Sequence, residues 1–397
     1  MRTLKNLINL CFLLLGHLFI RNKRKIVFGA WEGCSYSDNP KFLFEYFFDH
    51  QEWTIVWVGN KSTKTTIPKL PANASFAVRH SLLGIWHALT AKTWVFSHSP
   101  NDISIFALWG NALLIDTCHG VALKKVGESC PSFKKKHSML DNFWRHIFSN
   151  KIYLAMPSKL QGENTIKSFP GLFQEPFLPF GSTTLDFIIH EKANIRLIKA
   201  LRKKFAMLFN LPLDKKWIVY APTFRHTTSV NFSFRSLPID KSNRLSEILT
   251  KNNAIIIEKL HPDSITDAPA IQCDNIFAIS GPAAKLLEPH ELWLSADAII
   301  SDYSSAVIPF YLQSKPVIHF AYDYDFYVNQ DTGLIADLSD IRFGLIAPNF
   351  DELCGLLSNI DTARNNCGKM APQLIEYEIG DACNQYLNFI SHMLISD

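Results

Sequence analysis

Short runs of β-branched and other apolar residues alternate along this chain with longer segments in which apolar residues recur at helical spacing. In the first half, this pattern predicts strands at residues 26–30, 54–59, 93–98, 113–118 and 152–156, and helices at residues 40–50, 81–90 and 159–169. In the second half, it predicts strands at residues 217–221, 254–260, 275–279, 298–301 and 316–320, and helices at residues 245–251, 288–295 and 351–360. Such an alternation of strands and helices is typical of a parallel α/β fold.

A charged helical pattern at residues 191–209 separates the two halves, and the turn Leu211-Pro212-Leu213-Asp214 follows it. The length of 397 residues also fits two domains of ordinary size. We therefore expect an α/β protein of two Rossmann-like domains that face a central cleft, at residues 26–190 and 191–397, as in the GT-B class of glycosyltransferases. Ligands of such sheets bind at the carboxyl ends of the parallel strands.

The first 25 residues have a different character from the rest. Residues 7–20 are mostly apolar, and basic side chains flank them on both sides: Arg2, Lys5, Arg21, Lys23, Arg24 and Lys25. A bilayer span needs about 20 apolar residues, so this stretch is short for one. A secretory signal peptide would need a small-residue cleavage site, and here the apolar run ends in basic residues that lead into a predicted strand. We expect residues 1–25 to form an amphipathic helix on the cytoplasmic face of the cell membrane, a peripheral attachment; the alternative is a first helix packed on the domain core.

Composition excludes several other classes of protein. Hydrophobic residues make up 47% of the chain and charged residues 19%, too apolar for a disordered protein. The first 25 residues hold six of the 40 basic residues and none of the 36 acidic ones, so the remainder carries 34 basic against 36 acidic side chains and is no nucleic-acid binder. The eight cysteines include no C-x-x-C pair, which favours free thiols in a reducing cytosol and argues against a zinc site.

Polar clusters follow three of the predicted strands in the second half. Thr223 and Arg225 follow the strand at 217–221, His261 follows the strand at 254–260, and Ser304 and Ser305 follow the strand at 298–301. The two serines precede a helical segment, so their hydroxyls and the free backbone N–H groups behind them make an anion cradle. An arginine offers a planar fork for phosphate oxygens, and a histidine can donate to a phosphate or a leaving group. The alternatives are a helix cap for Ser304, a core histidine for His261 and an ion pair for Arg225.

The strand predicted at 113–118 is followed by His119 and Gly120. A histidine at a strand end is a candidate general base facing the cleft, and the glycine allows a ligand or another backbone to come close. Lys124 and Lys125 come next, and beside such a base they are candidates to guide a polyanionic acceptor, although a basic run is more often a solvated face.

Taken together, these motifs resemble a known family. They stand in this order along the chain: Asn39-Pro40-Lys41, Cys118-His119-Gly120 with Lys124-Lys125, Ala221-Pro222-Thr223-Phe224-Arg225, His261-Pro262, Asp302-Tyr303-Ser304-Ser305 and Lys315-Pro316. From about residue 26 to 340 the chain resembles the CDP-glycerol glycerophosphotransferase family of teichoic-acid and capsule polymerases.

The resemblance implies peripheral membrane attachment and transfer of glycerol phosphate from CDP-glycerol, or of a related alditol phosphate from its CDP donor, to an anionic polymer or lipid-linked acceptor, without a cofactor or metal. The family's two histidines fall on His119 and His261. The resemblance places the donor-binding residues in the second domain and the acceptor-side residues in the first: Thr223, Arg225, Asp302, Ser304 and Ser305 for the donor, and Gly120, Lys124 and Lys125 for the acceptor.

Three positions depart from the family pattern. Cys118 replaces the usual tryptophan before the H-G motif, the turn Gly181-Ser182-Thr183-Thr184-Leu185-Asp186 lacks the usual proline and arginine, and Pro309 stands where an acidic residue follows D-Y-S-S. Asp323-Tyr324-Asp325 matches the D-x-D motif that holds a divalent ion in the other large class of glycosyltransferases. Its aromatic neighbours supply few oxygen ligands, so we expect no metal there.

The chemistry we expect is attack by an acceptor hydroxyl on the β-phosphorus of the CDP-linked alditol, with release of CMP. His119 accepts the hydroxyl proton, while His261, Arg225, Ser304 and Ser305 hold the pyrophosphate. A rival interpretation is a GT-B glycosyltransferase that uses a UDP- or GDP-sugar. A third is an inactive polymer- or lipid-binding protein.

Overall fold

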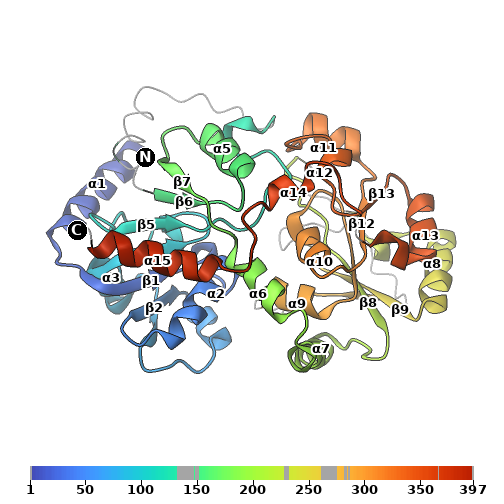
Figure 1. Ribbon diagram of the computed structural model, residues 1–397, viewed down its shortest axis with the longest axis horizontal. Helices are drawn as coiled ribbons and strands as arrows, with labels where there is room; N and C mark the ends of the chain where they lie inside the picture. Colours follow the sequence, from blue (N-terminus) through green and yellow to red (C-terminus); the bar gives the residue numbers. More distant parts are fainter. Residues whose placement is uncertain are drawn as a thin grey trace. The chain divides into compact units, whose positions relative to one another are not determined.

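The computed structural model describes residues 2–131, 147, 152–227, 232–260, 275–280, 284, 287–364 and 366–395. The chain divides into two compact units, each built from segments that are separate in sequence (Figure 1). Unit 1 comprises Met1–Gly120, Lys136–Phe187 and Ile375–Asp397, and unit 2 comprises Val121–Lys135 and Ile188–Leu374. The expected domain ranges, 26–190 and 191–397, therefore differ from these units at residues 121–135, at residues 188–190 and at the C-terminal segment from Ile375.

Unit 1 contains a sheet of seven parallel strands in the order β3-β2-β1-β4-β5-β6-β7. The strands are β1 (Asn22–Phe28), β2 (Thr54–Gly59), β3 (Ala74–Val78), β4 (Ala91–Phe96), β5 (Leu113–Asp116), β6 (Ile152–Ala155) and β7 (Phe173–Leu178). Along β1, Ile26 and Phe28 pack into the core on one face of the sheet and Val27 into the core on the other. Both faces are buried, which explains why the strands are apolar runs without polar alternation.

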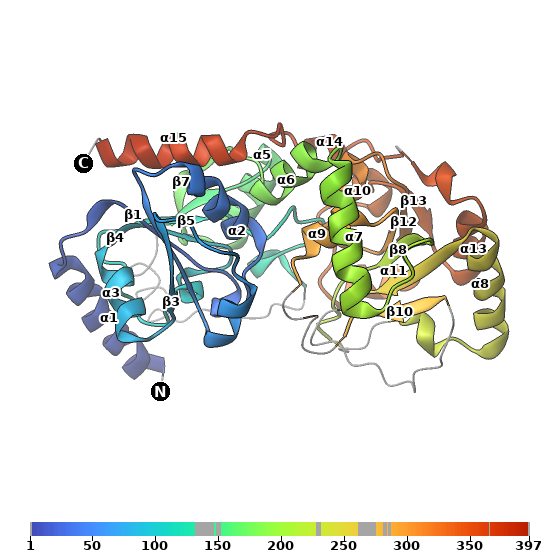
Figure 2. The ribbon, with the colours of Figure 1, turned by 90° about the horizontal axis from the view of Figure 1, so that it is seen from below.

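Helices cover both faces of this sheet. Those of unit 1 are α1 (Arg2–Leu18), α2 (Asp38–Tyr46), α3 (Leu82–Thr90), α5 (Lys159–Ser168) and α15 (Ala382–Ile395), with α6 (Thr183–Glu191) at the boundary. α1 and α3 contribute to one core, through Leu13 and Leu89, and α2 and α15 to the other, through Phe44 and Tyr386. Figure 2 shows α15 along one face of the sheet and α1 with α3 along the opposite face. This packing puts the C-terminal helix in unit 1.

Unit 2 contains six parallel strands in the order β10-β9-β8-β11-β12-β13. They are β8 (Lys216–Tyr220), β9 (Ala254–Glu258), β10 (Ile276–Ala278), β11 (Ala298–Ser301), β12 (Val317–Phe320) and β13 (Leu345–Ala347). The helices are α7 (Ile195–Phe209), α8 (Ile239–Lys251), α9 (Pro289–Ser295), α10 (Ile308–Leu312), α11 (Tyr324–Gln330), α12 (Leu338–Ile341), α13 (Phe350–Ser358) and α14 (Ala371–Leu374). α8 and α13 pack on one face, where Leu245 and Leu353 join the core.

The expected strands and helices are present in order, with three strands added, β3, β7 and β13, and with further helices, among them α6, α11 and α15. The three added strands are edge strands of their sheets. In β3 and β7 several side chains are exposed or half-buried, so the apolar run that marks an interior strand is missing.

The N-terminal residues deviate from the expectation in one respect. Arg21 and Lys25, which we expected on lipid headgroups, are buried. The Arg21 guanidinium donates to the backbone carbonyl oxygens of Ala91 and Leu108 at 2.6 and 2.7 Å, and Lys25 donates to the Thr90 hydroxyl at 2.8 Å. Arg21, which also donates to the Gly16 carbonyl oxygen of α1, therefore joins the end of α1 to the body of unit 1, and Lys25 joins β1 to α3. None of the helices in the described part of the chain is long and apolar enough to cross a membrane.

Candidate active site

In each sheet the strand order reverses next to the first strand, between β1 and β4 in unit 1 and between β8 and β11 in unit 2. Open α/β sheets bind their ligands at such a switch point, outside the carboxyl ends of the strands. At the switch point of unit 1, Trp31 follows β1 and His98 follows β4, and the candidate His119 follows the next strand, β5. At the switch point of unit 2, the candidates Thr223 and Asp302 follow β8 and β11.

In unit 1, His119 stacks on a second histidine. The rings of His119 and His98 are parallel within 5°, with centroids 4.1 Å apart, and the Trp31 ring lies 4.2 Å from His98 and 6.0 Å from His119. Sequence reasoning placed His98 at a strand end without assigning it a role, and it did not consider Trp31. The sequence does contain a signal for this pair, because both histidines stand at the carboxyl ends of two consecutive predicted strands.

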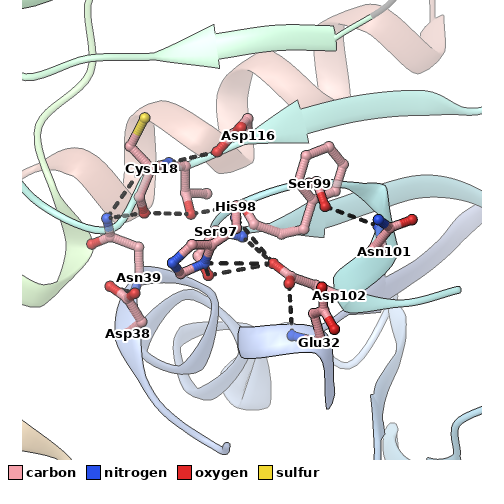
Figure 3. A network of polar contacts seen from close by, with 12 residues as sticks. Glu32, Asp38, Asn39, Ser97, His98, Ser99, Asn101, Asp102, Asp116 and Cys118 are labelled. Atoms are coloured by element: carbon pink, nitrogen blue, oxygen red, sulfur yellow. Dashed lines mark hydrogen bonds and ion pairs between the residues drawn. The ribbon is translucent and has the colours of Figure 1, made fainter. Parts of the chain in front are cut away.

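Asp102 fixes the turn that carries His98 and the turn at Glu32, which is next to Trp31 in sequence (Figure 3). This buried carboxylate accepts the backbone N–H groups of Glu32, Ser97 and His98 at 2.8 to 3.0 Å. One side chain therefore ties the turn after β1 to the turn after β4. The Trp31 turn needs such support, because Trp31 and Glu32 both have positive φ angles, 49° and 51°.

Asn39 fixes the turn that carries His119. Its amide nitrogen donates to the carbonyl oxygens of Thr117 and Cys118 at 2.9 and 3.0 Å, as Figure 3 shows. Cys118 itself has a positive φ of 52°, and its N–H donates to Asp116 at 2.8 Å.

The motif Gly181–Asp186, which includes the start of α6, completes this support. Thr183 donates its hydroxyl to the Asn39 carbonyl oxygen at 2.7 Å, and the Thr184 N–H donates to the Asn39 side-chain oxygen at 3.0 Å. Three motifs that are far apart in sequence, around residues 39, 118 and 183, thus form one hydrogen-bonded group behind His119.

In unit 2, Arg225 has a different environment from the one we expected. The side chain is 1% exposed, and it lies between the carboxylates of Asp302, at 2.8 Å, and Asp323, at 2.7 Å. Its third nitrogen donates to the Thr223 carbonyl oxygen at 2.6 Å, and the rings of Tyr303 and Tyr327 pack over the guanidinium. The pKa of Arg225 is raised, because the two carboxylates outweigh the opposing effect of burial. The ion-pair alternative of the sequence analysis thus describes Arg225.

Asp302 orders the end of strand β11 and its neighbour. Besides Arg225, its carboxylate accepts the backbone N–H groups of Thr223 and Tyr303 at 2.8 and 2.5 Å. His319, on β12, lies behind it: Nδ1 is 2.6 Å from the Asp302 carbonyl oxygen, and Nε2 accepts the Phe343 N–H at 3.1 Å. Burial lowers the pKa of His319 to about 4, so this ring is neutral at pH 7. Sequence reasoning did not consider His319.

Ser304 and Ser305 begin a short helical segment, a 3₁₀ turn at Ser305–Val307 followed by the five-residue α10. Ser304 caps it, since its hydroxyl accepts the Ala306 N–H at 3.2 Å. Both serines are half-buried. They are accessible, unlike Arg225, and the helix behind them, α10, has only five residues.

Lys124 and Lys125 lie in unit 2, whereas we expected them on the acceptor side of the first domain. The Lys125 N–H donates to Gly333 O at 3.0 Å, and Lys124 pairs with Leu334 in an isolated antiparallel bridge. Burial lowers the pKa of Lys124, and the carboxylates of Asp302 and Asp331 oppose this effect. Lys124 therefore lies near the Asp302 cluster. Gly120, at the end of the unit 1 segment, has a φ of 131°, which explains its glycine.

Two further expectations concern His261 and metal binding. His261 lies outside the described residues. In the D-x-D motif, Asp323 accepts from Arg225 and from the Tyr303 hydroxyl, at 3.0 Å, so its oxygens are already engaged. No group of three or more His, Cys, Asp or Glu side chains in the described ranges could hold a metal ion.

Two Rossmann-like parallel sheets, each with polar side chains at its switch point, define a GT-B-like α/β protein. A family model described as CDP-glycerol:poly(glycerophosphate) glycerophosphotransferase matches residues 11–390, nearly the whole chain. The chain belongs to this family and is a transferase of the teichoic-acid polymerase type.

The relatives agree with this assignment. The chain is 25% identical over 358 residues to a teichoic acid glycerol-phosphate transferase of Staphylococcus aureus, which covers 87% of this chain and 86% of that protein. It is 30% identical over 344 residues, 84% of its length, to a teichoic acid poly(ribitol-phosphate) polymerase of Bacillus spizizenii, of which it spans 50%. Its fold matches a variant of the wall teichoic acid polymerase TagF with a TM-score of 0.77 at 22% identity, covering 99% of this chain and 94% of that one.

Proposed function

We propose that this enzyme transfers glycerol phosphate, or a related alditol phosphate, from a CDP-linked donor to a terminal hydroxyl of a teichoic-acid or capsule-type polymer. The observation that carries the proposal is the position of His119, held at a strand end by Asn39 in a chain of this family. The acceptor oxygen forms a bond to the β-phosphorus, the bond from that phosphorus to the CMP oxygen breaks, and His119 takes the hydroxyl proton. CMP leaves with the electron pair of the broken bond.

The donor phosphates are bound by groups of unit 2. We assign Ser304 and Ser305 hydroxyls, the Thr223 side chain, and His261 to this task, and we add the Lys124 ammonium, which lies near Asp302. Arg225 and Asp302 act through others: their ion pair holds the turns that carry Thr223 and Tyr303. Phosphoryl transfer depends mainly on positioning and charge stabilisation, so this set needs no cofactor.

The same enzyme attaches to the cytoplasmic face of the cell membrane through α1 and α3. The exposed face of α1 carries apolar side chains at helical spacing: Leu4, Leu7, Ile8, Leu14, Leu15 and Leu18. On α3, Leu82, Leu83 and Trp86 are also exposed. The centroid of the Trp86 ring lies 6.4 Å from that of Phe19, the residue that follows α1, so the two helices lie close together here. Leu18 is 80% and Leu82 90% exposed, unusual for leucines of a folded unit. With the exposed Lys5, Lys23 and Arg24 nearby, this face has the composition of a surface that binds anionic lipid.

The experiment that tests the function measures CMP release from a panel of CDP-glycerol, CDP-ribitol, UDP-glucose and GDP-mannose, with a short polymer acceptor. We expect release only from the CDP-alditols, and we expect His119→Ala to lower kcat by about 10²–10⁴-fold with little change in the donor KM. Turnover of a uridine or guanosine sugar would support the glycosyltransferase instead. No turnover and no nucleotide binding would support a polymer- or lipid-binding protein.

A further inference from the structure

The stacking of His98 on His119 is a feature of unit 1 to which the proposed reaction gives no role. The two residues come from the ends of neighbouring strands, β4 and β5, and their rings are 4.1 Å apart and nearly parallel. Trp31 covers His98 from another side. The base is therefore one of three aromatic rings in contact.

His98 is held more firmly than an ordinary surface histidine. Its Nδ1 lies 2.7 Å from the Ser97 hydroxyl, and that hydroxyl lies 3.4 Å from Asp102 Oδ2. The Ser97 hydroxyl thus shares a hydrogen bond with the His98 ring and lies beside the Asp102 carboxylate. Asp102 also accepts the His98 backbone N–H at 3.0 Å. Ring and backbone are thus both anchored to one buried carboxylate.

We propose that His98 is a positioning residue for the base: its anchored ring holds the His119 imidazole in one plane and stabilises the imidazolium that forms when His119 accepts the acceptor proton. The inference rests on the proposed role of His119. A π-face within about 6 Å of a cation is attractive, and a parallel ring also restricts rotation of its neighbour. A fixed ring plane matters because a general base must have its nitrogen within hydrogen-bond reach of the hydroxyl.

The charge state of His98 suits this role. Burial lowers the pKa of His98 to about 4, so a neutral ring faces His119 at neutral pH and no second cation opposes its protonation. Asp102 is an ionisable group beside His98, with Oδ2 3.9 Å from Nδ1. Asp116 and Asp38 act on Cys118, the residue before His119, and Glu32 and Asp102 act on Arg79. Burial raises the pKa of Asp116 to about 7. Arg79 donates to the carbonyl oxygens of Glu32 and Asn101.

Two variants of similar volume separate the ring from the rest of the side chain. His98→Leu removes the aromatic face, and His98→Phe keeps it without the ring nitrogens. We expect His98→Leu to lower kcat by about 3- to 30-fold with the donor KM within about twofold of wild type, and to lower the pKa of His119 in the pH–rate profile. His98→Phe should retain kcat within about threefold and keep the His119 pKa near its wild-type value. His190→Ala, on the exposed side of α6, is the control for histidine loss.

The direct readout is the titration of the His119 ring by NMR in the full-length protein, without substrate. A His119 pKa unchanged in His98→Leu, or lowered equally in His98→Phe and His98→Leu, would overturn the proposal. If His98→Leu does not fold, His98→Gln is the second variant without a ring. Activity retained in His119→Ala would refute the base assignment, whereas the NMR titration still decides whether His98 controls the His119 ring.

Discussion

The side-chain amide nitrogen of Asn39 lies 3.0 Å from the carbonyl oxygen of Cys118 and donates a hydrogen bond to it. Through this bond, a residue at the start of α2 determines the shape of the turn that presents His119. Asn39→Asp replaces the donor by an acceptor that repels the two carbonyl oxygens. We expect kcat to fall by about 10- to 100-fold and the free energy of unfolding by about 1–3 kcal/mol, measured by CMP release and urea unfolding. Asn388→Asp, on the exposed surface of α15, is the matched control. Wild-type turnover in Asn39→Asp would contradict the role of this bond.

The buried ion pairs of Arg225 predict a large and non-additive effect on stability. Arg225→Met leaves the carboxylates of Asp302 and Asp323 close together without their cation, so we expect the free energy of unfolding of unit 2 to fall by roughly 3–5 kcal/mol. Adding Asp302→Asn removes one of the uncompensated charges and should recover part of the loss. Urea unfolding of the two single variants and the double variant measures this coupling. If the losses in the free energy of unfolding of Arg225→Met and Asp302→Asn were additive in the double variant, the Arg225–Asp302 ion pair would make no specific contribution to stability.

Glu378 predicts a pH dependence of stability. Its carboxyl accepts the Ser182 hydroxyl at 2.9 Å, and burial raises its pKa from 4.5 to about 8. Between these values the native state binds more protons than the unfolded state, so the free energy of unfolding falls as the pH rises from about 4.5 to about 8. Glu378→Gln removes this dependence and can still accept from Ser182. The stability of Glu378→Gln relative to wild type should therefore increase over this range, and a pH-independent difference would contradict the raised pKa.

The exposed apolar face of α1 and α3 predicts vesicle binding. Leu14→Glu combined with Leu18→Glu places two charges in the acyl boundary, so we expect affinity for anionic vesicles to fall at least about tenfold while turnover of a short, water-soluble acceptor stays unchanged. Met207→Glu, at an exposed apolar position on α7, is the control. Salt should weaken wild-type binding only in part, since apolar burial is not screened. Equal sedimentation of both variants with vesicles would refute the membrane face.

The D-x-D motif predicts a result with chelator. Because Arg225 and Tyr303 engage Asp323, we expect EDTA to leave CMP release intact and Asp325→Ala to retain wild-type kcat. Asp323→Ala should instead lower stability, through the loss of one of the Arg225 ion pairs. This interpretation would be reversed if CMP release strictly required a metal ion and if Asp325→Ala abolished CMP release.

The local pattern of apolar and polar residues is sufficient to predict the interior strands, the fold class and most candidate residues of this protein. The strands that lie inside the sheets are buried on both faces and are therefore continuous apolar runs, which the sequence alone reveals. The parallel α/β class follows from their alternation with helices. His119, Thr223, Asp302 and the two serines are candidates because polar residues directly after an apolar run fall at the carboxyl edge of a parallel sheet, and the motif order indicates the family.

Tertiary structure decided the environment of each of these residues. The sequence predicts that the Arg225 guanidinium is available to bind phosphate. In the structure it is paired with the carboxylates of Asp302 and Asp323, which are 77 and 98 positions away in sequence. Lys124 follows the His119 motif by only a few residues, yet backbone pairing with residue 334 puts it in the other unit. The stacking of His98 on His119 depends on the register of β4 against β5. Sequence patterns indicate which side chains are buried, because burial follows from local periodicity. The contacts between charged groups and between rings involve segments that are distant in sequence, and these contacts form only when the sheet is assembled.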